Sequence, residues 1–247
     1  MKKLSSVLSW LITLLVPLGL LGLGVRVLLT PAFPQFEYRL PSFPADEYGF
    51  TTADRLRWGT YGINYLLNNS EISYLGALKF QDGSPLFSDR ELSHMHDVKR
   101  VTQGFLLAWN GVLTVLLLLA VWAWRGRWGL AFRAGARRGG RLTLLLALAV
   151  GAIGTVGASG SGDVFWEFFA DFHGLFFTGE SWLFSYSDTL IRLYPLRFWQ
   201  DAVLYIGVIT ALAAAALAFG IKIRSTGPTS SSGTRGPNHA SRAVASP

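Results

Sequence analysis

Three histidines have the side-chain chemistry and the sequence context for acid–base catalysis: His94, His96 and His173. An imidazole titrates near neutral pH, so it can take a proton from one group of a substrate and deliver a proton to another. If the segment around the first two is helical, the side chains of His94 and His96 point about 200° apart, and only one can face a given cavity. Asp97 either orients the His94 ring or makes a surface contact.

A metal centre is the alternative use of these donors, since zinc is bound by histidine and carboxylate groups. The chain has no H-E-x-x-H motif and no clustered ligand spacing. It also has no cysteine, which excludes disulfides and thiolate chemistry. We therefore expect neither a metal nor another cofactor, and a zinc-dependent membrane hydrolase is kept as an alternative.

The elements that must position the histidines are long and apolar. Four stretches, at about 7–29, 101–124, 142–162 and 202–221, are each long enough to cross a hydrocarbon core of about 30 Å. They lack the polar residue at every third or fourth position that marks a helix of a soluble core. The sequence predicts an all-α membrane protein with four transmembrane helices and two outward-facing loops containing short helices.

Charged residues are segregated along the chain. The N-terminal tail, the segment 125–141 and the C-terminal tail contain twelve Lys and Arg and no acidic residue, whereas all fifteen Asp and Glu lie in 30–103 and 163–201. Because Lys and Arg collect in cytoplasmic loops, both termini are predicted in the cytoplasm and the histidine-bearing loops outside the plasma membrane. The net charge of +7 is then a topology signal that also attracts anionic lipid, and nucleic-acid binding is not expected.

Local patterns predict the order of elements within these loops. Four prolines between 31 and 44 favour an extended, irregular segment. Ser88 and Glu91 form an S-x-x-E capping box that should start a helix continuing into the second span. An aromatic-rich amphipathic helix is expected at 163–177, at the membrane interface.

The chain is expected to form one membrane domain, at 1–224. In its third span, glycines at 151, 154, 157 and 160 suggest a face for close helix packing. The remaining segment, 225–247, is rich in Ser, Thr, Gly and Pro and is expected to be a disordered cytoplasmic tail.

Two motifs resemble those of a known family. The run F-S-D-R-E-L-S-H-M-H-D-V-K at 87–99 resembles the S-x-R-E-x-x-H-M-x-D-V-K signature of bacterial lipoprotein intramolecular transacylases. The run F-A-D-F-H-G-L-F-F at 169–177, followed by Trp182, D-T-L at 188–190 and Tyr194, is similar to the family's second motif. The similarity covers most of residues 50–205 and agrees with four spans.

The resemblance implies an enzyme that moves the sn-2 acyl chain of a diacylglyceryl-cysteine lipoprotein onto the α-amino group of the same cysteine, giving a lyso-form lipoprotein. The family's two motif histidines fall on His94 and His173, whereas His96 occupies a variable position. The partners would be diacylglyceryl-modified lipoproteins and membrane lipid. The sequence leaves open the oligomeric state and which histidine is the base.

Further residues of the two motifs are supporting or substrate-binding candidates: Asp97, Arg90, Lys99, Glu91, Trp182 and Tyr194. Arg90 and Lys99 could stabilise oxyanion charge or bind lipid phosphate, or simply be surface charges. Trp182 and Tyr194 could instead be interfacial anchors. A non-enzymatic transporter subunit or scaffold is the remaining alternative function.

Overall fold

The computed structural model describes residues 2–158 and 164–221. Within these residues the chain is all-helical, and the only β pairing is an isolated bridge between Lys79 and Pro85. The helices in chain order are α1 (Lys2–Leu28), α2 (Ala32–Glu37), α3 (Thr52–Leu67), α4 (Ser73–Gly76), α5 (Asp89–Arg125), α6 (Gly129–Ala158), α7 (Val164–Phe176), α8 (Thr189–Leu193) and α9 (Leu196–Gly220). The predicted all-α class is confirmed.

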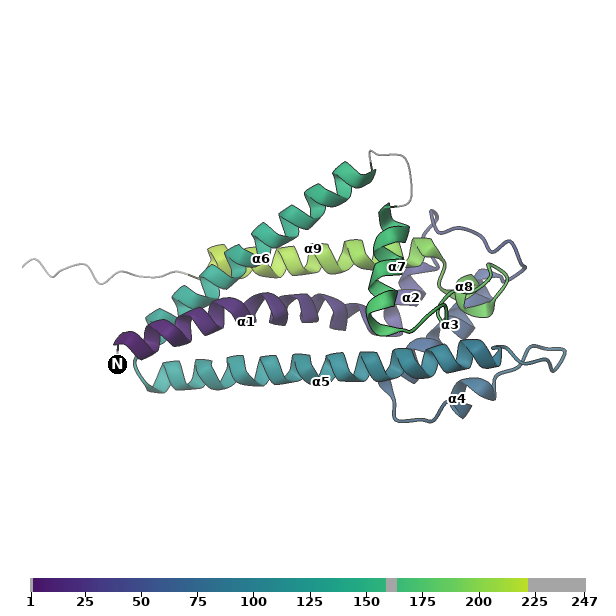
Figure 1. Ribbon diagram of the computed structural model, residues 1–247, viewed down its shortest axis with the longest axis horizontal. Helices are drawn as coiled ribbons and strands as arrows, with labels where there is room; N and C mark the ends of the chain where they lie inside the picture. Colours follow the sequence, from purple (N-terminus) through teal and green to yellow (C-terminus); the bar gives the residue numbers. More distant parts are fainter. Residues whose placement is uncertain (1, 159–163, 222–247) are drawn as a thin grey trace, which may run out of the picture.

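Three helices in the described part of the chain are long and apolar enough to cross a membrane: α1, α5 and α9. They run alongside one another in Figure 1. The third predicted span, at 142–162, begins within α6 and ends outside the described residues. Three predicted spans thus coincide with such helices, and the fourth crossing stays a prediction. The predicted tail at 225–247 also lies outside the described residues.

Glycines in the first half of α6 set its distance from the other long helices. A methyl group at Gly135 or Gly139 would collide with α1, and one at Gly140 would collide with α9. Small residues at these positions therefore allow the close approach of helix backbones. Gly151, the first glycine of the packing face predicted further along the helix, faces open space and contacts no other described helix. The other three glycines of that set fall where no surroundings are described.

The proline-rich segment is predicted to be extended and irregular, but part of it forms helix α2. Pro31 occupies the N-cap position of α2, and Pro34 lies in its first turn. Backbone N–H groups in a first turn have no intrahelical acceptor, so a proline there removes no hydrogen bond. The prolines therefore position a short helix directly after α1.

Short helices and loops form a cap at one end of the long helices, seen at the right of Figure 1. Its core contains Tyr65, Leu86 and Leu193, each at most 2% exposed. Met95 of α5 and Phe198 of α9 belong to the same cluster, so the cap packs directly on two membrane-capable helices. Because Leu190 and Leu193 of α8 belong to the same cluster as Met95, this packing fixes the first turns of α5 relative to α8.

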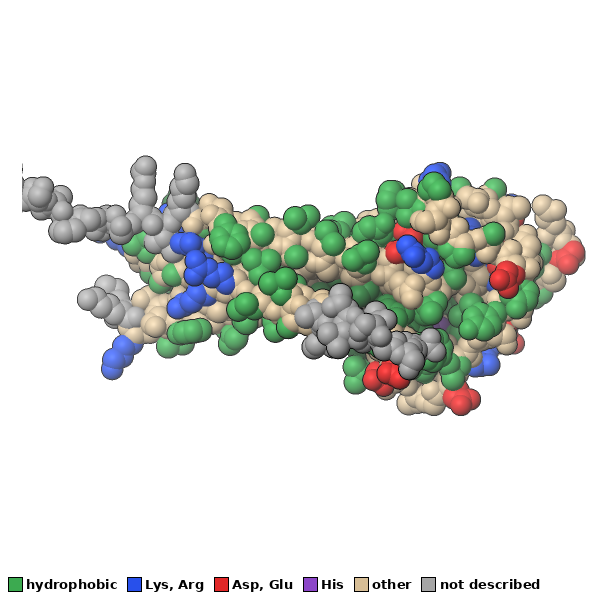
Figure 2. All heavy atoms as spheres, turned by 90° about the horizontal axis from the view of Figure 1, so that it is seen from above, with side chains coloured by type: hydrophobic (Ala, Val, Ile, Leu, Met, Phe, Trp, Pro, Cys, Tyr) green, Lys and Arg blue, Asp and Glu red, His purple; other side chains and the backbone are tan. Residues whose placement is uncertain are grey.

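Charge follows the same long axis. Figure 2 shows Asp and Glu side chains only towards the cap on the visible face, where Lys and Arg side chains also occur, whereas the charged side chains at the opposite end, where α1 begins, are all basic. An apolar girdle separates the two ends. This arrangement places the predicted outer loops together at one end of the molecule.

Candidate functional site

The two motif histidines meet at the junction of the cap and the long helices. His94 lies in the second turn of α5, and His173 lies in the last turn of α7. Their ring centroids are 6.3 Å apart, and the ring planes are inclined by 22°. The structure therefore brings together two imidazoles that are far apart in the sequence.

A capping box at Ser88 explains why α5 begins at Asp89, one turn before His94. The Ser88 side chain accepts from the backbone N–H of Glu91, and the Glu91 carboxylate accepts from the backbone N–H of Ser88. The predicted capping box is thus confirmed. The helix then runs unbroken to Arg125, so His94 lies on a rigid element that continues into the apolar bundle.

Aromatic rings enclose both imidazoles. Phe177 and Phe184 lie 4.9 and 5.4 Å from His94 between ring centroids. Phe169 and Trp182 lie 4.0 and 4.8 Å from His173. Phe184 was missed by the sequence analysis, since it belongs to neither motif and nothing local shows that its loop folds back onto α5. These contacts leave both histidines partly buried and so reduce their exposure to water.

One hydrogen bond fixes the tautomer of His173. Its Nδ1 lies 2.7 Å from the carbonyl oxygen of Phe169, one turn earlier in α7. A carbonyl only accepts, so Nδ1 carries the proton and donates it. In the neutral ring, Nε2 then holds a free lone pair. His173 is therefore arranged to accept a proton at Nε2.

His94 is held neutral by its surroundings. Burial, with a smaller contribution from His173, lowers its pKa to about 4, and the charge of Asp97 opposes this shift. Burial also lowers the pKa of His173, opposed by the hydrogen bond to Phe169. Nδ1 of His94 is buried and has no hydrogen-bond partner among the described residues. The pair therefore presents neutral imidazoles with unused hydrogen-bonding capacity.

His96 and Asp97 lie on the wetter side of α5. His96 Nδ1 is 3.6 Å from an Asp97 carboxylate oxygen, and both side chains are about half exposed. No hydrogen bond joins Asp97 to His94 within the described part of the chain. Asp97 therefore influences His94 through its charge and does not fix the orientation of its ring.

Arg90 and Glu91 contact the segment that follows α7. Nη2 of Arg90 donates to the carbonyls of Glu180 and Leu183. Glu91 accepts a 2.7 Å hydrogen bond from the backbone N–H of Leu190. These two motif residues thus connect the start of α5 to the α7–α8 connection and to α8.

Lys99 and Tyr194 have hydrogen bonds within the cap. Lys99 Nζ donates to the Ser70 carbonyl at 2.6 Å and lies 4.0 Å from the centre of the Tyr65 ring. The Tyr194 hydroxyl donates to the Gly59 carbonyl at 2.5 Å. Of the six supporting candidates, Trp182 is the one whose ring directly contacts an imidazole.

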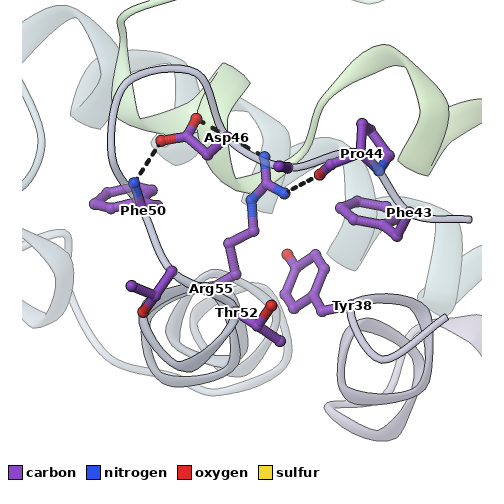
Figure 3. Close-up of a pocket in the computed structure, with 9 residues that line it drawn as sticks. Tyr38, Phe43, Pro44, Asp46, Phe50, Thr52 and Arg55 are labelled. Carbon is purple, nitrogen blue, oxygen red and sulfur yellow. Dashed lines mark hydrogen bonds and ion pairs between the residues drawn. The ribbon is translucent and has the colours of Figure 1, made fainter. Parts of the chain in front are cut away.

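A second polar cluster lies in the cap beside a cavity of about 260 Å³. Arg55 reaches between Asp46 and the Pro44 carbonyl, as Figure 3 shows. The same carboxylate accepts from the Phe50 N–H at 2.6 Å and from Arg192 at 3.0 Å. These groups are paired with one another and tie the loop after α2 to α8. The cluster therefore stabilises the cap and contains none of the predicted site residues.

Metal ligation finds no support in the geometry. The described residues hold no group of three His, Cys, Asp or Glu side chains placed to bind a metal ion. His94 and His173 face aromatic rings instead of a carboxylate. The arrangement suits proton transfer and hydrogen bonding to a bound substrate.

Comparison with known sequences finds relatives over most of the chain. Residues 10–199 match the family described as lipoprotein intramolecular transacylase Lit. A protein of Aquifex aeolicus that is described as uncharacterized is 30% identical over 227 residues, which cover 92% of this chain and 94% of that protein.

Solved structures show the same fold. The membrane-integral lipoprotein intramolecular transacylase of Bacillus cereus superimposes with a TM-score of 0.65 at 15% identity, covering 88% of this chain and 94% of that chain. A variant of it with one histidine replaced by alanine gives a TM-score of 0.62 at 13% identity, covering 87% and 91%.

Proposed function

The chain belongs to the lipoprotein intramolecular transacylases, which are membrane-integral acyltransferases, and from this we propose the reaction and the residues that carry it out. The substrate is a lipoprotein whose N-terminal cysteine bears a diacylglyceryl group. The enzyme moves the sn-2 acyl chain to the α-amino group of that cysteine. The product is an N-acyl, S-monoacylglyceryl lipoprotein, the lyso form.

The observation that carries this proposal is the convergence of His94 and His173 in an aromatic enclosure. An ammonium group must lose a proton before it can attack an ester, and the departing alkoxide must gain one. Two neutral imidazoles, one of them with a defined free nitrogen, supply both functions without a serine or cysteine nucleophile.

The steps follow from the tautomer of His173. Its Nε2 takes a proton from the α-ammonium, and the free amine attacks the carbonyl carbon of the sn-2 ester. His94 donates a hydrogen bond to the oxygen on which negative charge develops. The C–O bond to glycerol then breaks, and the glyceryl oxygen receives the proton of the imidazolium. The new amide nitrogen still carries a second proton, which the neutral His173 takes and releases to water. One proton is therefore released per turnover, and both imidazoles return to the neutral state.

Positioning contributes to the rate because nucleophile and ester belong to one molecule. An enclosure that holds the amine against the ester can lower the activation barrier by several kcal/mol, because the entropy of ordering the two groups is lost on binding and not in the chemical step. Phe177, Phe184 and Trp182 provide flat apolar surfaces for that purpose. Excluding water also disfavours hydrolysis of the ester.

The site is proposed to face the outside of the plasma membrane. His94 and His173 lie at the end of the molecule that carries the visible Asp and Glu side chains, whereas the charged side chains at the other end are all basic (Figure 2). A lipoprotein anchored in the outer leaflet presents its modified cysteine at that level. The first turns of α5 are therefore the depth at which substrate and imidazoles can meet.

Mass spectrometry of a reporter lipoprotein tests the proposal. The enzyme would be expressed in a host that makes diacylated lipoproteins, and the N-terminal lipopeptide would be analysed. Wild-type enzyme should convert the reporter to the lyso form. His94→Ala and His173→Ala should each abolish conversion while the protein remains in the membrane fraction.

His96→Ala is the matched control. It lies on the same helix two residues from His94, and its half-exposed ring pairs with Asp97. Conversion should be unchanged in this variant. Normal levels of lyso form in both the His94→Ala and His173→Ala variants would show that the pair does not catalyse the reaction.

A further inference from the structure

The connection between α7 and α8, residues 177–188, lies over the histidine pair. Phe184 contacts the His94 ring at 5.4 Å, and Trp182 contacts the His173 ring at 4.8 Å, between centroids. The segment turns at Gly179, whose φ of 60° is in the left-handed region that favours glycine. One loop therefore supplies an aromatic ring to each imidazole.

The hydrogen bonds within this loop do not explain its position over the histidines. A Leu183 N–H to Glu180 carbonyl bond and the turn closed by Ser185 and Asp188 shape it locally. Neither bond connects it to α5. Loops with exposed backbone and few internal contacts open at low free-energy cost, so an external contact must hold this one.

Arg90 provides that contact from the helix that carries His94. Its Nη2 donates to the carbonyl of Glu180 at 3.0 Å and to the carbonyl of Leu183. The guanidinium carbon lies 5.1 Å from the centre of the Phe184 ring. The Arg90 side chain thus forms hydrogen bonds with two carbonyls of the loop and stacks on the Phe184 ring, which contacts His94.

The guanidinium group is suited to this task. It is planar, always charged, and combines several fixed donors with stacking on aromatic faces. Both bonds come from one nitrogen, Nη2, so an ammonium group with its three donors could form them, but it has no planar face to stack on the Phe184 ring. Because two carbonyls engage Nη2, this part of Arg90 is occupied by the loop and not free for a lipid phosphate.

We propose that Arg90 is a positioning residue that holds the 177–188 loop closed over His94 and His173, acting through Phe184. The inference rests on the proposed role of the histidine pair. In this scheme Arg90 touches neither the ester nor the amine. It keeps the imidazoles dry, and its release opens the site to the diacylglyceryl group.

Closure by the loop is measurable because it changes the titration of His94. Burial is the main reason that the His94 pKa is low, and Phe184 forms part of what buries it. The charged and titratable groups facing this ring are Asp97 from its own helix and His173 from α7. If the loop leaves, water reaches the ring, and its pKa should rise towards the ordinary value of about 6.5.

Histidine titration by NMR on the purified full-length protein in detergent tests the proposal. The four histidine signals would be assigned with single His→Gln variants. In Arg90→Gln the His94 midpoint should move up by at least one pH unit, and the rate of lyso-form production should fall at least tenfold. Arg90→Lys should give a smaller shift and a smaller loss. Phe184→Ala should reproduce the Arg90→Gln shift without any change in charge.

Two comparisons separate positioning from other effects of the substitution. Arg100→Gln removes the same charge from an exposed position on the same helix and should leave both readouts at wild-type values. The double variant Arg90→Gln, Phe184→Ala should be no more impaired than Phe184→Ala alone, because both changes remove one interaction. An additive loss of activity, or an unchanged His94 midpoint in Arg90→Gln, would overturn the proposal.

Failure of this inference is distinguishable from failure of the proposed function. The titration does not depend on turnover, so it reports loop closure even if the acyl-transfer assignment is incorrect. Conversely, inactive His94→Ala and His173→Ala variants together with an unshifted Arg90→Gln protein would retain the function and exclude this role for Arg90.

Discussion

A single hydrogen bond, from His173 to the Phe169 carbonyl, separates the two imidazoles chemically. It leaves Nε2 of His173 free to accept a proton, whereas Nδ1 of His94 is buried without a partner in the described part of the chain. Two residues of the same type therefore differ in their hydrogen bonding, which is why we propose different roles for them. The sequence could identify both histidines, but it could not assign the base, because the tautomer depends on the geometry of α7.

The fall of kcat at low pH should depend on the lowered pKa values of the two histidines. A lowered pKa means that the imidazole stays neutral, and able to accept a proton, at pH values where an ordinary histidine is already charged. With the pKa of His94 near 4 and that of His173 also lowered, kcat should show its acid-side break below the ordinary histidine value of about 6.5. The measurement is kcat against pH with a saturating diacylated lipopeptide in detergent. The substrate ammonium titrates near 8 and does not produce a break in this range.

A break at or above pH 6.5 would contradict this prediction. It would mean that the imidazoles are hydrated in the working enzyme and that the aromatic enclosure does not form around them. The His96→Ala variant serves as the control, because its exposed ring should contribute nothing to the profile.

Among the secondary-structure elements, α5 and α8 are joined by one buried carboxylate. Glu91 is 3% exposed, with one oxygen accepting from the Ser88 N–H at 2.8 Å and the other accepting from the Leu190 N–H at 2.7 Å. It therefore caps one helix and fixes the position of another. Its place in the family motif is explained by this structural role as well as by any contact with substrate.

Glu91→Ala should destabilise the protein markedly. The substitution leaves the buried Leu190 N–H without an acceptor, which costs about 1–3 kcal/mol, and it also removes half of the capping box. Thermal unfolding in detergent should show a melting temperature lower by about 5 °C. Glu71→Ala, at an exposed position in the cap, should change the melting temperature little. Equal melting temperatures for wild type and Glu91→Ala would contradict the role given to this carboxylate.

Helix α2 introduces a second buried carboxyl group, that of Glu37. Its side chain is fully buried, and neither oxygen has a partner among the described residues when the group is charged. Burial is the largest cause, followed by a hydrogen bond with Asp201 and the charge of that residue, and together they raise the pKa of Glu37 to about 7. A protonated Glu37 can donate a hydrogen bond to Asp201, which also accepts a 2.6 Å hydrogen bond from Nε of Arg197.

The stability of the protein should therefore fall as pH rises through 7. Glu37 binds its proton more tightly in the folded state than in the unfolded state, where its pKa is near 4.5, so the stabilisation is complete below pH 4.5 and is lost above 7. Its upper limit is about 3 kcal/mol. Melting temperatures at pH 6 and pH 8 should differ more in wild type than in Glu37→Gln, and the variant should be the more stable protein at pH 8. The exposed Glu47→Gln is the control. A wild-type melting temperature that does not drop between the two pH values would exclude a shared proton.

Local patterns predicted the elements better than their partners. The S-x-x-E box marked the start of α5 because a capping box depends on residues three positions apart. The contacts of Arg90 and Lys99 were not predictable, since they depend on where distant loops pass. The short helix α2 was missed because proline was taken as a helix breaker at a position where it is compatible with a first turn. Sequence spacing thus identified the two histidines that the structure brings together, and tertiary packing determined which other motif residues lie beside them.

At the scale of the whole molecule, an apolar bundle separates an end whose visible charges are all basic from a cap that carries both acidic and basic side chains (Figure 2). This segregation supports the predicted orientation, because basic residues are retained on the cytoplasmic side. Helix α6 matters most here. If it crosses the membrane, α7 and α8 lie on the same side as the loop between α2 and α5, and the two histidines approach from two outer loops.

Cysteine labelling can establish this orientation cleanly, because the chain contains no native cysteine. Single cysteines would be placed at three exposed positions, Gln81 before α5, Arg125 at its end and Ser187 after α7. In intact cells, a membrane-impermeant maleimide should label the Gln81→Cys and Ser187→Cys proteins and should not label Arg125→Cys. Permeabilised cells should show labelling of all three. Labelling of Ser187→Cys only after permeabilisation would mean that α6 does not cross and that the imidazoles cannot meet on the outer side, whereas external labelling of Arg125→Cys would reverse the orientation and place the site in the cytoplasm.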